Sequence, residues 1–196
     1  LAKDVEETDI LIDEDLIYIS YAKKNIDGCN EDALRIDVAR LSIDNLVFKK
    51  VYHQDPDQFD TPNPDNCKVF NVTGGVMDII SENGEKHLIV SILDQESKNY
   101  FLPEQYKNDL TFKYATIMKI NINNKDIEVI SSGHRNPHGL IGLDNGIILS
   151  TEHGPKGGDE INLIKKDKNY GWPFVSYGEP YSFNQSDFFV YEKDHK

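Results

Sequence analysis

Short runs of apolar and β-branched residues alternate along the chain with polar stretches rich in glycine, asparagine, aspartate and proline. Windows with apolar residues at the helical spacing i, i+3, i+4 and i+7 do not stand out, so the pattern favours strands over amphipathic helices. The strands it predicts cover residues 16–22, 34–43, 46–52, 76–80, 87–93, 115–122, 127–132, 146–152 and 160–164. The sequence therefore predicts an all-β fold.

A weak internal repeat indicates that these strands belong to a recurring structural unit. The segments "DEDLIYISYA", "NGEKHLIVSILD" and "LDNGIILSTEH" each combine a polar turn with an apolar strand, and the strands start near Leu16, Leu88 and Ile147. A repeated four-strand unit indicates a β-propeller, whose blades take roughly 40 to 50 residues and more where loops are inserted. Periodicity by itself leaves a β-sandwich equally open. We interpret residues 1–196 as one domain or part of one.

Charge and cysteine content narrow the function classes. The chain of 196 residues has a formal net charge of −13, and such a field repels phosphate backbones, which argues against nucleic-acid binding. No apolar run approaches 18 residues, so the sequence predicts no membrane span. Cys29 and Cys67 both lie among turn residues; they could form one disulfide in an oxidising compartment or remain unrelated thiols.

The stretch "TEHGPKGGDE", residues 151–160, places many special residues between two predicted strands. It matches neither a phosphate-binding loop nor an EF-hand loop. Gly154 and Pro155 allow exposed carbonyl oxygens, which are hard ligands for calcium, and Asp159 and Glu160 add carboxylates nearby. The alternative is an acidic hairpin in solvent.

The stretch "SSGHRNPHGL", residues 131–140, offers a second candidate. His134 and His138 have the spacing of a helical zinc pair, but the proline and glycine beside them make a helix improbable. A turn that presents Arg135 and Asn136 is more natural. The planar fork of Arg135 suits carboxylates, although an arginine here could also serve only to tie down a loop.

Several long motifs carry a resemblance to a known family. The segments "GHRNPHGL", "TEHGPKGGDEINLI" and "KNYGWPFVSYG", preceded in order by "GGVMDI", "HLIVSILD" and "YATIMKI", resemble the soluble aldose sugar dehydrogenases that depend on pyrroloquinoline quinone (PQQ), the glucose/sorbosone dehydrogenase family. The resemblance implies a six-bladed β-propeller. About three to four blades would fit into this chain, so we expect a partial propeller.

The resemblance also implies a cofactor, a substrate and a location. The family oxidises a sugar hydroxyl with PQQ and calcium and is periplasmic or secreted, a location that would suit a Cys29–Cys67 bridge. Matched by motif, Arg135 and Asn136 would contact PQQ. His153, Gly154 and Pro155 would lie beside the cofactor calcium, with the carbonyls of Gly154 and Pro155 as its ligands.

A second, structural calcium is implied by the same motifs. Glu160 and the carbonyl of Tyr170 match its ligands. The residues between 151 and 160 would then hold two ions, which accounts for the length of that connection.

The sequence departs from the family at the catalytic base. Alignment on Gly74 and Gly75 puts Val72 where the family has the histidine that takes the proton from the sugar. A valine cannot accept a proton, and general-base help is worth about 10²–10⁴-fold in rate. We therefore assign no catalytic residue and expect a dehydrogenase of reduced or altered activity.

A non-catalytic protein is the alternative function. It would be a calcium-stabilised propeller that binds a sugar or a protein partner. An incomplete ring would also expose strand edges, so we expect that two copies of the chain could associate as a homodimer.

Overall fold

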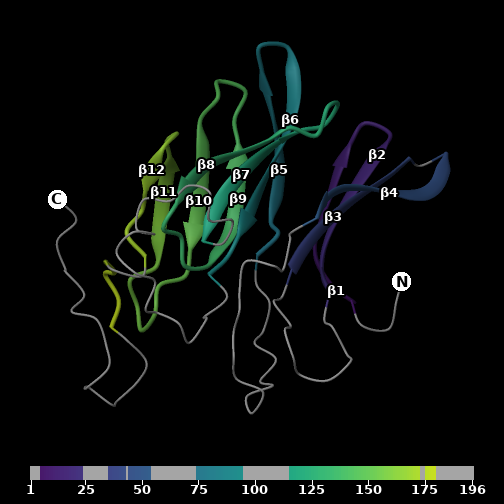
Figure 1. The fold of residues 1–196 in the computed structure, drawn as a ribbon. Coiled ribbons are helices and arrows are strands. Elements are labelled where there is room, and N and C mark those ends of the chain that lie inside the picture. Colours follow the sequence, from purple (N-terminus) through teal and green to yellow (C-terminus); the bar gives the residue numbers. More distant parts are fainter. Residues whose placement is uncertain are drawn as a thin grey trace.

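The computed structural model describes residues 5–23, 35–42, 44–53, 74–94, 115–172 and 175–179. Within these ranges all regular structure is β-strand and there is no helix, which confirms the all-β prediction (Figure 1). It follows that these ranges contain no helix able to cross a membrane.

The strands form three sheets, which we name A, B and C. Sheet A has the order β1-β2-β3-β4, with β1 (Val5–Asp13), β2 (Leu16–Lys23), β3 (Arg35–Ser42) and β4 (Asn45–His53). Sheet B has the order β12-β8-β7-β6-β5, with β5 (Met77–Glu82), β6 (Glu85–Ile92), β7 (Thr116–Asn121), β8 (Ile127–Ser132) and β12 (Lys168–Asn169). Sheet C has the order β11-β10-β9, with β9 (Pro137–Gly142), β10 (Ile148–Glu152) and β11 (Glu160–Ile164).

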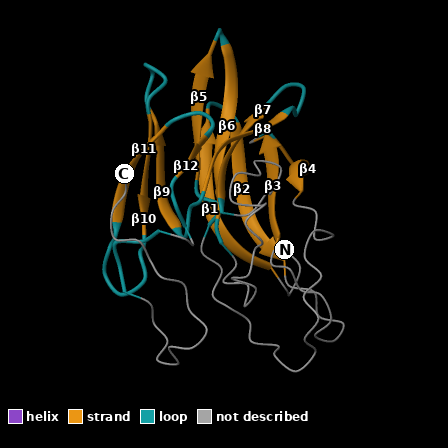
Figure 2. Cartoon of the chain, turned by 60° about the vertical axis from the view of Figure 1, so that its left-hand side comes forward, coloured by secondary structure: helices purple, strands orange, loops and turns teal. Residues whose placement is uncertain are grey.

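Sheet B is covered on both faces. Six successive residues of β6, from His87 to Ile92, are buried, which an alternating strand shows only when each face packs on a partner. Leu88 and Val90 of β6 face Tyr18 and other residues of sheet A in one core cluster, whereas Ile89 faces sheet C in a second cluster. The sheets stack face to face like successive blades of a propeller (Figures 1 and 2).

A repeated aspartate joins each sheet to the next. Asp9 of β1 accepts the backbone N–H of Met77 in sheet B at 2.8 Å. Asp78 of β5 accepts the backbone N–H of Gly142 in sheet C at 2.7 Å. Each aspartate also accepts the N–H of the isoleucine that follows it. Both carboxylates thus satisfy backbone donors between sheets, where an unpaired donor would be costly.

The internal repeat of the sequence corresponds to β2, β6 and β10, the second strands in chain order of sheets A, B and C. The hydrophobic pattern did not predict β1, β9 or β12. Strand β1 has two glutamates directly after its first residue, Val5, and β12 has only two residues. Strand β9 begins at Pro137, and a proline is tolerated there because the first residue of a strand can lack its N–H.

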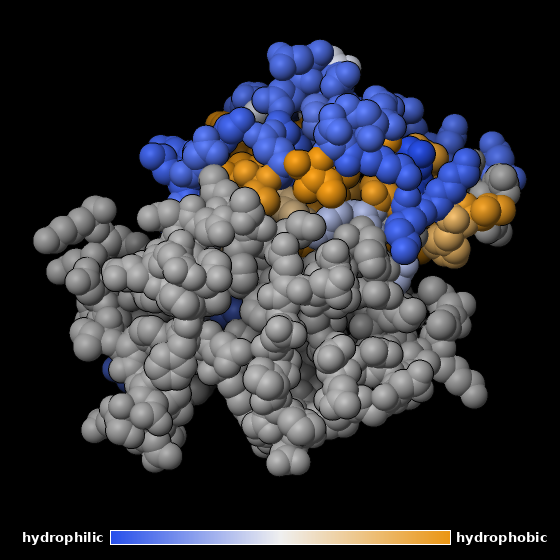
Figure 3. All heavy atoms as spheres, in the orientation of Figure 1, coloured by the Kyte–Doolittle hydropathy of each residue, from blue (hydrophilic) through white to orange (hydrophobic). Residues whose placement is uncertain are grey.

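The outer faces of the end sheets carry exposed apolar side chains. Ile10 and Ile12 of β1 are 61% and 65% exposed, and Ile161 and Leu163 of β11 are 79% and 47% exposed. Figure 3 shows hydrophilic residues over the upper ends of the sheets and hydrophobic residues below them. Apolar side chains exposed at both ends of a stack of sheets are typical of surfaces that contact other protein.

Candidate functional site

The antiparallel pairing of β9 and β10 brings the two predicted loops to one end of sheets B and C. Pro137, where β9 begins, pairs with Glu152, where β10 ends. The residues before β9 and those after β10 therefore lie side by side, and the N–H of His153 donates to the carbonyl of Asn136 at 3.0 Å. We call residues 133–136 the RN loop and residues 153–159 the glycine loop.

A third segment, residues 169–172, packs against the start of the RN loop. The N–H of Tyr170 donates to Ser132 O at 2.9 Å, and that of Trp172 donates to Gly133 O at 3.0 Å. Gly133 has φ +74°, and a Cβ at this position would lie only 2.8 to 2.9 Å from the backbone nitrogens of Gly171 and Tyr170. Only glycine allows this close approach.

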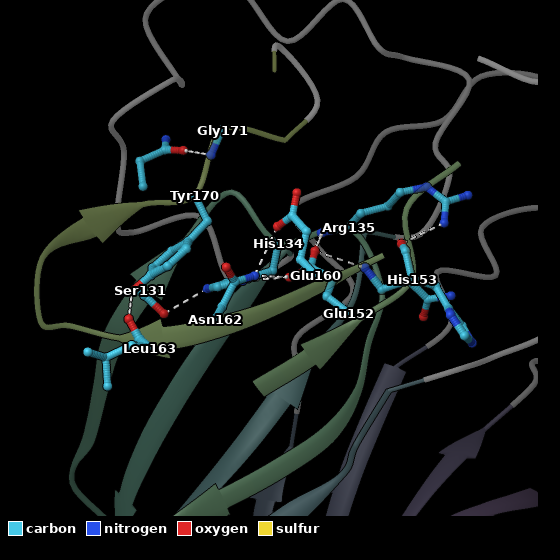
Figure 4. A network of polar contacts seen from close by, with 12 residues as sticks. Ser131, His134, Arg135, Glu152, His153, Glu160, Asn162, Leu163, Tyr170 and Gly171 are labelled. Carbon is cyan, nitrogen blue, oxygen red and sulfur yellow. Dashed lines mark hydrogen bonds and ion pairs between the residues drawn. The ribbon is translucent and has the colours of Figure 1, made fainter. Parts of the chain in front are cut away.

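Arg135 is fixed from several sides (Figure 4). Its side chain is buried, and its Nη1 donates to the carbonyls of His153 and Gly154 at 2.9 Å each. The guanidinium carbon lies 5.2 Å from the ring centre of Trp172, a cation–π distance. Its own carbonyl accepts the N–H of Asp94 at 3.0 Å, and Asp94 in turn accepts the indole N–H of Trp172.

The carboxylate of Glu152 lies buried beneath the RN loop. Its Oε1 accepts the backbone N–H of Arg135 and, at 3.3 Å, that of Asn136. Its Oε2 lies 3.1 Å from His134 Nδ1 and 3.3 Å from Asn162 Nδ2. One carboxylate thus satisfies three donors from the RN loop and one from β11, which compensates for its loss of water.

His134 links this carboxylate to β8. The ring is fully buried, and its Nε2 lies 2.8 Å from Ser131 Oγ. Because an ionised carboxylate only accepts, Nδ1 of His134 must carry a proton toward Glu152. Ser131 then donates to Nε2 when the imidazole is neutral, and this assignment gives every polar atom of the chain Ser131–His134–Glu152 a complementary partner.

Tyr170 covers the other face of this network. Its ring stacks on that of His134, with 4.7 Å between centroids. Its hydroxyl donates to Leu163 O at 2.5 Å and accepts the N–H of Lys165 at 2.9 Å. Burial raises the pKa of the Tyr170 hydroxyl, and the Lys165 N–H offsets part of that rise. The segment 169–172 is therefore bound to β8, the RN loop and β11.

Two main-chain oxygens of the glycine loop lie close to Gly154. A Cβ on Gly154 would overlap the carbonyl oxygens of Gly157 and Gly158. Asp159 accepts the N–H of Gly154 at 3.1 Å, and its other oxygen lies 3.5 Å from His153 Nδ1. The loop therefore gathers carbonyl and carboxylate oxygens, the donors that a hard cation requires.

The remaining predicted site residues lie near the RN loop and the glycine loop. Pro155 is buried in the glycine loop. Glu160 pairs with Glu152 across β10 and β11, and the amide of Asn162 donates to both, to Glu160 at 3.0 Å. Tyr170 reaches the centre through its ring. The structure thus brings Arg135, Asn136, His153 and Gly154 into direct contact, with Glu160 and Tyr170 one residue further away.

His134 and His138 do not form a zinc pair. His134 is buried, whereas His138 is exposed on β9 and meets the ring of His153 edge-on at 4.3 Å between centroids. Partial burial, and then the neighbouring His153, lowers the pKa of His138. Across the described ranges, no three side chains of His, Cys, Asp or Glu are grouped to hold a metal.

Some predictions fall on residues that the structure does not describe. Val72, Cys29 and Cys67 are among them, so the expected base position and the expected disulfide lie outside the described residues. Conversely, the sequence motifs did not indicate Glu152 or Asn162, and they offered His134 only as half of a zinc pair. A signal for Glu152 was present, because Ile148, Ser150 and Glu152 share one face of β10 and the first of them is apolar.

Comparisons with known proteins identify relatives of the chain. The family model described as Glucose / Sorbosone dehydrogenase matches residues 3–193. The aldose sugar dehydrogenase YliI of Escherichia coli strain K12 is 32% identical over 174 residues, which cover 85% of this chain and 44% of the relative. Quinoprotein glucose dehydrogenase B of Acinetobacter calcoaceticus is 54% identical over 48 residues, 24% of this chain and 10% of the relative.

Solved structures agree with the fold. A crystal structure of a glucose dehydrogenase superposes with a TM-score of 0.58 at 25% identity and covers 89% of this chain and 51% of its own. A second glucose dehydrogenase gives a TM-score of 0.57 at 25% identity, over 84% of this chain and 47% of its own. The three sheets therefore form part of a propeller, and the chain spans about half the length of these relatives.

Proposed function

Because the chain belongs to the glucose/sorbosone dehydrogenase family, we propose that it functions as a PQQ- and calcium-dependent oxidoreductase that acts on a hydroxyl group of an aldose sugar. The names of two relatives, an aldose sugar dehydrogenase and a quinoprotein glucose dehydrogenase, support the substrate class and the quinone. The observation that carries the proposal is Arg135, a buried guanidinium held beside the carbonyls of the glycine loop.

The residues of the RN loop fit PQQ. The cofactor is a planar quinone with three carboxylates, and a guanidinium pairs with such oxygens in a bidentate manner. Arg135 has a fixed backbone and an aromatic neighbour, Trp172, so little side-chain entropy remains to be lost when an anion binds. Arg135, Asn136 and His153 would hold the cofactor.

The glycine loop fits calcium. Gly154 and Pro155 would supply carbonyl oxygens, and the crowding of main-chain oxygens around Gly154 supports this. In the structure Gly154 O accepts a hydrogen bond from Arg135, so a cation there would share this oxygen with the guanidinium. For the second ion we propose Glu160 and the carbonyl of Tyr170 as ligands.

The chain's own residues would contribute orientation and charge to the reaction. PQQ, when bound, supplies the two-electron acceptor. The fixed positive charge of Arg135 would stabilise negative charge on the bound quinone without reorganisation. At the expected base position stands Val72, which cannot take the proton of the sugar hydroxyl. We therefore propose reduced or altered dehydrogenase activity.

Val72 also favours a second candidate, a non-catalytic calcium-stabilised propeller that binds a sugar or a protein partner. With either candidate function we propose a periplasmic or secreted location and a Cys29–Cys67 disulfide. We also propose association of two copies, which is supported by the exposed apolar faces around Ile10 and Ile161.

Titration of the purified chain with PQQ in the presence and absence of calcium tests the proposal. We expect a saturable change in quinone absorbance that requires calcium and disappears in R135A. PQQ binding with no oxidation of aldoses would support the proposed loss of activity at the Val72 position. An absorbance spectrum unchanged by the protein at every calcium concentration would contradict both the PQQ proposal and the assigned role of Arg135.

A further inference from the structure

Glu152 is in direct contact with the main chain of both residues that are expected to bind the quinone. It accepts the backbone N–H of Arg135 and the backbone N–H of Asn136 with the same oxygen. We propose that Glu152 is the positioning residue of the RN loop and thereby sets the affinity for the cofactor. This inference rests on the proposed function and concerns residues that the sequence motifs did not identify.

The carboxylate controls where two consecutive side chains project. An N–H bond to an ionised acceptor is shorter and about twice as strong as a neutral one. When both N–H groups of a dipeptide point to one anion, the peptide plane between them is fixed, and so are the Cα–Cβ directions of Arg135 and Asn136. The RN loop lies outside any strand ladder, between β8 and β9, and Glu152 supports it in addition to the main-chain hydrogen bonds at Gly133 O, Arg135 O and Asn136 O.

The same strand end also holds the far end of Arg135. The residues that follow Glu152 provide the carbonyls of His153 and Gly154, and both accept from Nη1 of Arg135 at 2.9 Å. Arg135 is therefore clamped at its amide by the side chain of Glu152 and at its guanidinium by the main chain that follows. A shift of Glu152 would move both clamps together.

Burial of the Glu152 carboxylate costs free energy of solvation, so its presence indicates a structural or functional role. Glu152 is 6% exposed and lies on the inward face of β10, where Ile148 is apolar. It also pairs directly with a second carboxylate, Glu160, and like charges in that position destabilise a sheet. The amide of Asn162 between the two reduces this repulsion. An apolar residue would stabilise the sheet more easily, but it would leave the loop amides without an acceptor.

His134 provides a spectroscopic signature of the arrangement. In the native protein Nδ1 carries the proton, since it faces the acceptor-only carboxylate of Glu152. In E152Q, the single remaining oxygen is best placed under the two main-chain N–H groups, whose protons cannot move. The new NH₂ then faces His134, and the imidazole proton transfers to Nε2, where Ser131 Oγ can accept it.

The experiment compares the wild-type chain of 196 residues with E152Q in three measurements. Imidazole ¹⁵N shifts should report protonated Nδ1 in the wild type and protonated Nε2 in E152Q. Hydrogen exchange at the amides of Arg135 and Asn136 should be about tenfold faster in E152Q, because neutral acceptors bind these donors more weakly. The dissociation constant for PQQ should rise by about tenfold. If E152Q does not fold, E152D retracts the carboxylate by one methylene and should change the two exchange rates and the PQQ dissociation constant in the same direction, while Nδ1 of His134 keeps its proton.

D78N is the matched control. Asp78 also accepts two backbone N–H groups, but from Ile79 and from Gly142 at the opposite end of β9. D78N should leave His134, the RN-loop amides and PQQ affinity within about twofold of the wild type, since it removes equal charge elsewhere.

The outcomes separate this inference from the proposed function. If wild type and D78N bind PQQ and E152Q binds it equally well, Glu152 is not the positioning residue although the function stands. If the wild type fails to bind PQQ, the proposed function is wrong. Hydrogen exchange at the RN-loop amides is then the only test of the positioning role of Glu152. Faster exchange at Arg135 and Asn136 in E152Q only would then support it, and unchanged exchange would overturn it.

Discussion

Substitution of Gly133 by alanine tests whether the close approach between the RN loop and segment 169–172 stabilises the fold. Gly133 has φ +74°, so any L side chain there is strained by about 1–2 kcal/mol. The added Cβ would also meet the backbone nitrogens of Gly171 at 2.8 Å and Tyr170 at 2.9 Å, and it would displace the side-chain oxygen of Asn169. That oxygen accepts the N–H of Gly171 at 2.8 Å.

The chain contains a matched control for the backbone strain. Gly146 has φ +79°, almost the same as Gly133, but a Cβ there meets nothing within 4 Å. G146A should therefore cost about 1–2 kcal/mol. G133A adds the displacement of packed backbone and the loss of one hydrogen bond, for a total of about 3–6 kcal/mol.

Urea denaturation of both variants measures the difference. At about 3 °C per kcal/mol for a chain of this size, thermal scans should separate the two midpoints by several degrees. G133A should also weaken PQQ binding, because segment 169–172 carries the Trp172 ring that faces Arg135. Equal losses of stability in G133A and G146A would refute the reasoning, since strain would then account for the whole effect.

Three further predictions concern the sheets, the surface charges and the metal. D9N and D78N should each lower the free energy of unfolding by about 1 kcal/mol, measured by urea denaturation, because each removes a charge that accepts backbone N–H groups between sheets. The pKa of Glu128 is lowered by Lys119 and then by Lys166, so its contribution to stability is present above the unfolded pKa of about 4.5 and is lost as the pH falls below it. The thermal midpoint of E128Q should accordingly fall less steeply than that of the wild type between about pH 5 and pH 3, and parallel curves would contradict this. Calcium should raise the thermal midpoint of the wild type and EDTA should reverse the rise, whereas E160Q should lose part of it; a shift identical in E160Q would remove Glu160 from the ligand set.

The sequence predicted a strand most reliably where the strand is buried on both faces and therefore forms a continuous apolar run. Strand β6 was predicted from its apolar run, because burial on both faces leaves few polar residues to confuse the pattern. Strand β9 was missed because Pro137 and its glycines are turn residues by local preference. Pairing with β10 overrides that preference, and pairing between segments is not visible in a local window.

The candidate site divides in the same way. Arg135 and Gly154 were predicted from local motifs, and the structure places them in contact. The role of Glu152 depends on the register of β9 and β10, which sets a carboxylate under a loop 17 residues earlier in the chain. Alternation along β10 could show that Glu152 points inward, but only the fold shows what it meets there.

The position of Gly74 and Gly75 bears on the prediction that the catalytic base is absent. The N–H of Gly75 donates to Ser91 O at 2.7 Å, and its carbonyl accepts Ser20 Oγ at 2.6 Å, so the pair is held between sheets A and B. It precedes β5 and lies beside the end of β6, and Asp94, just after β6, binds the carbonyl of Arg135. The glycine pair and the RN loop therefore share one end of the stack. Val72, two residues before Gly74, lies outside the described residues, so its match to the catalytic histidine of the family stays a prediction. Proton transfer and cofactor retention would then depend on different segments, and the chain could lose the first while it keeps the second.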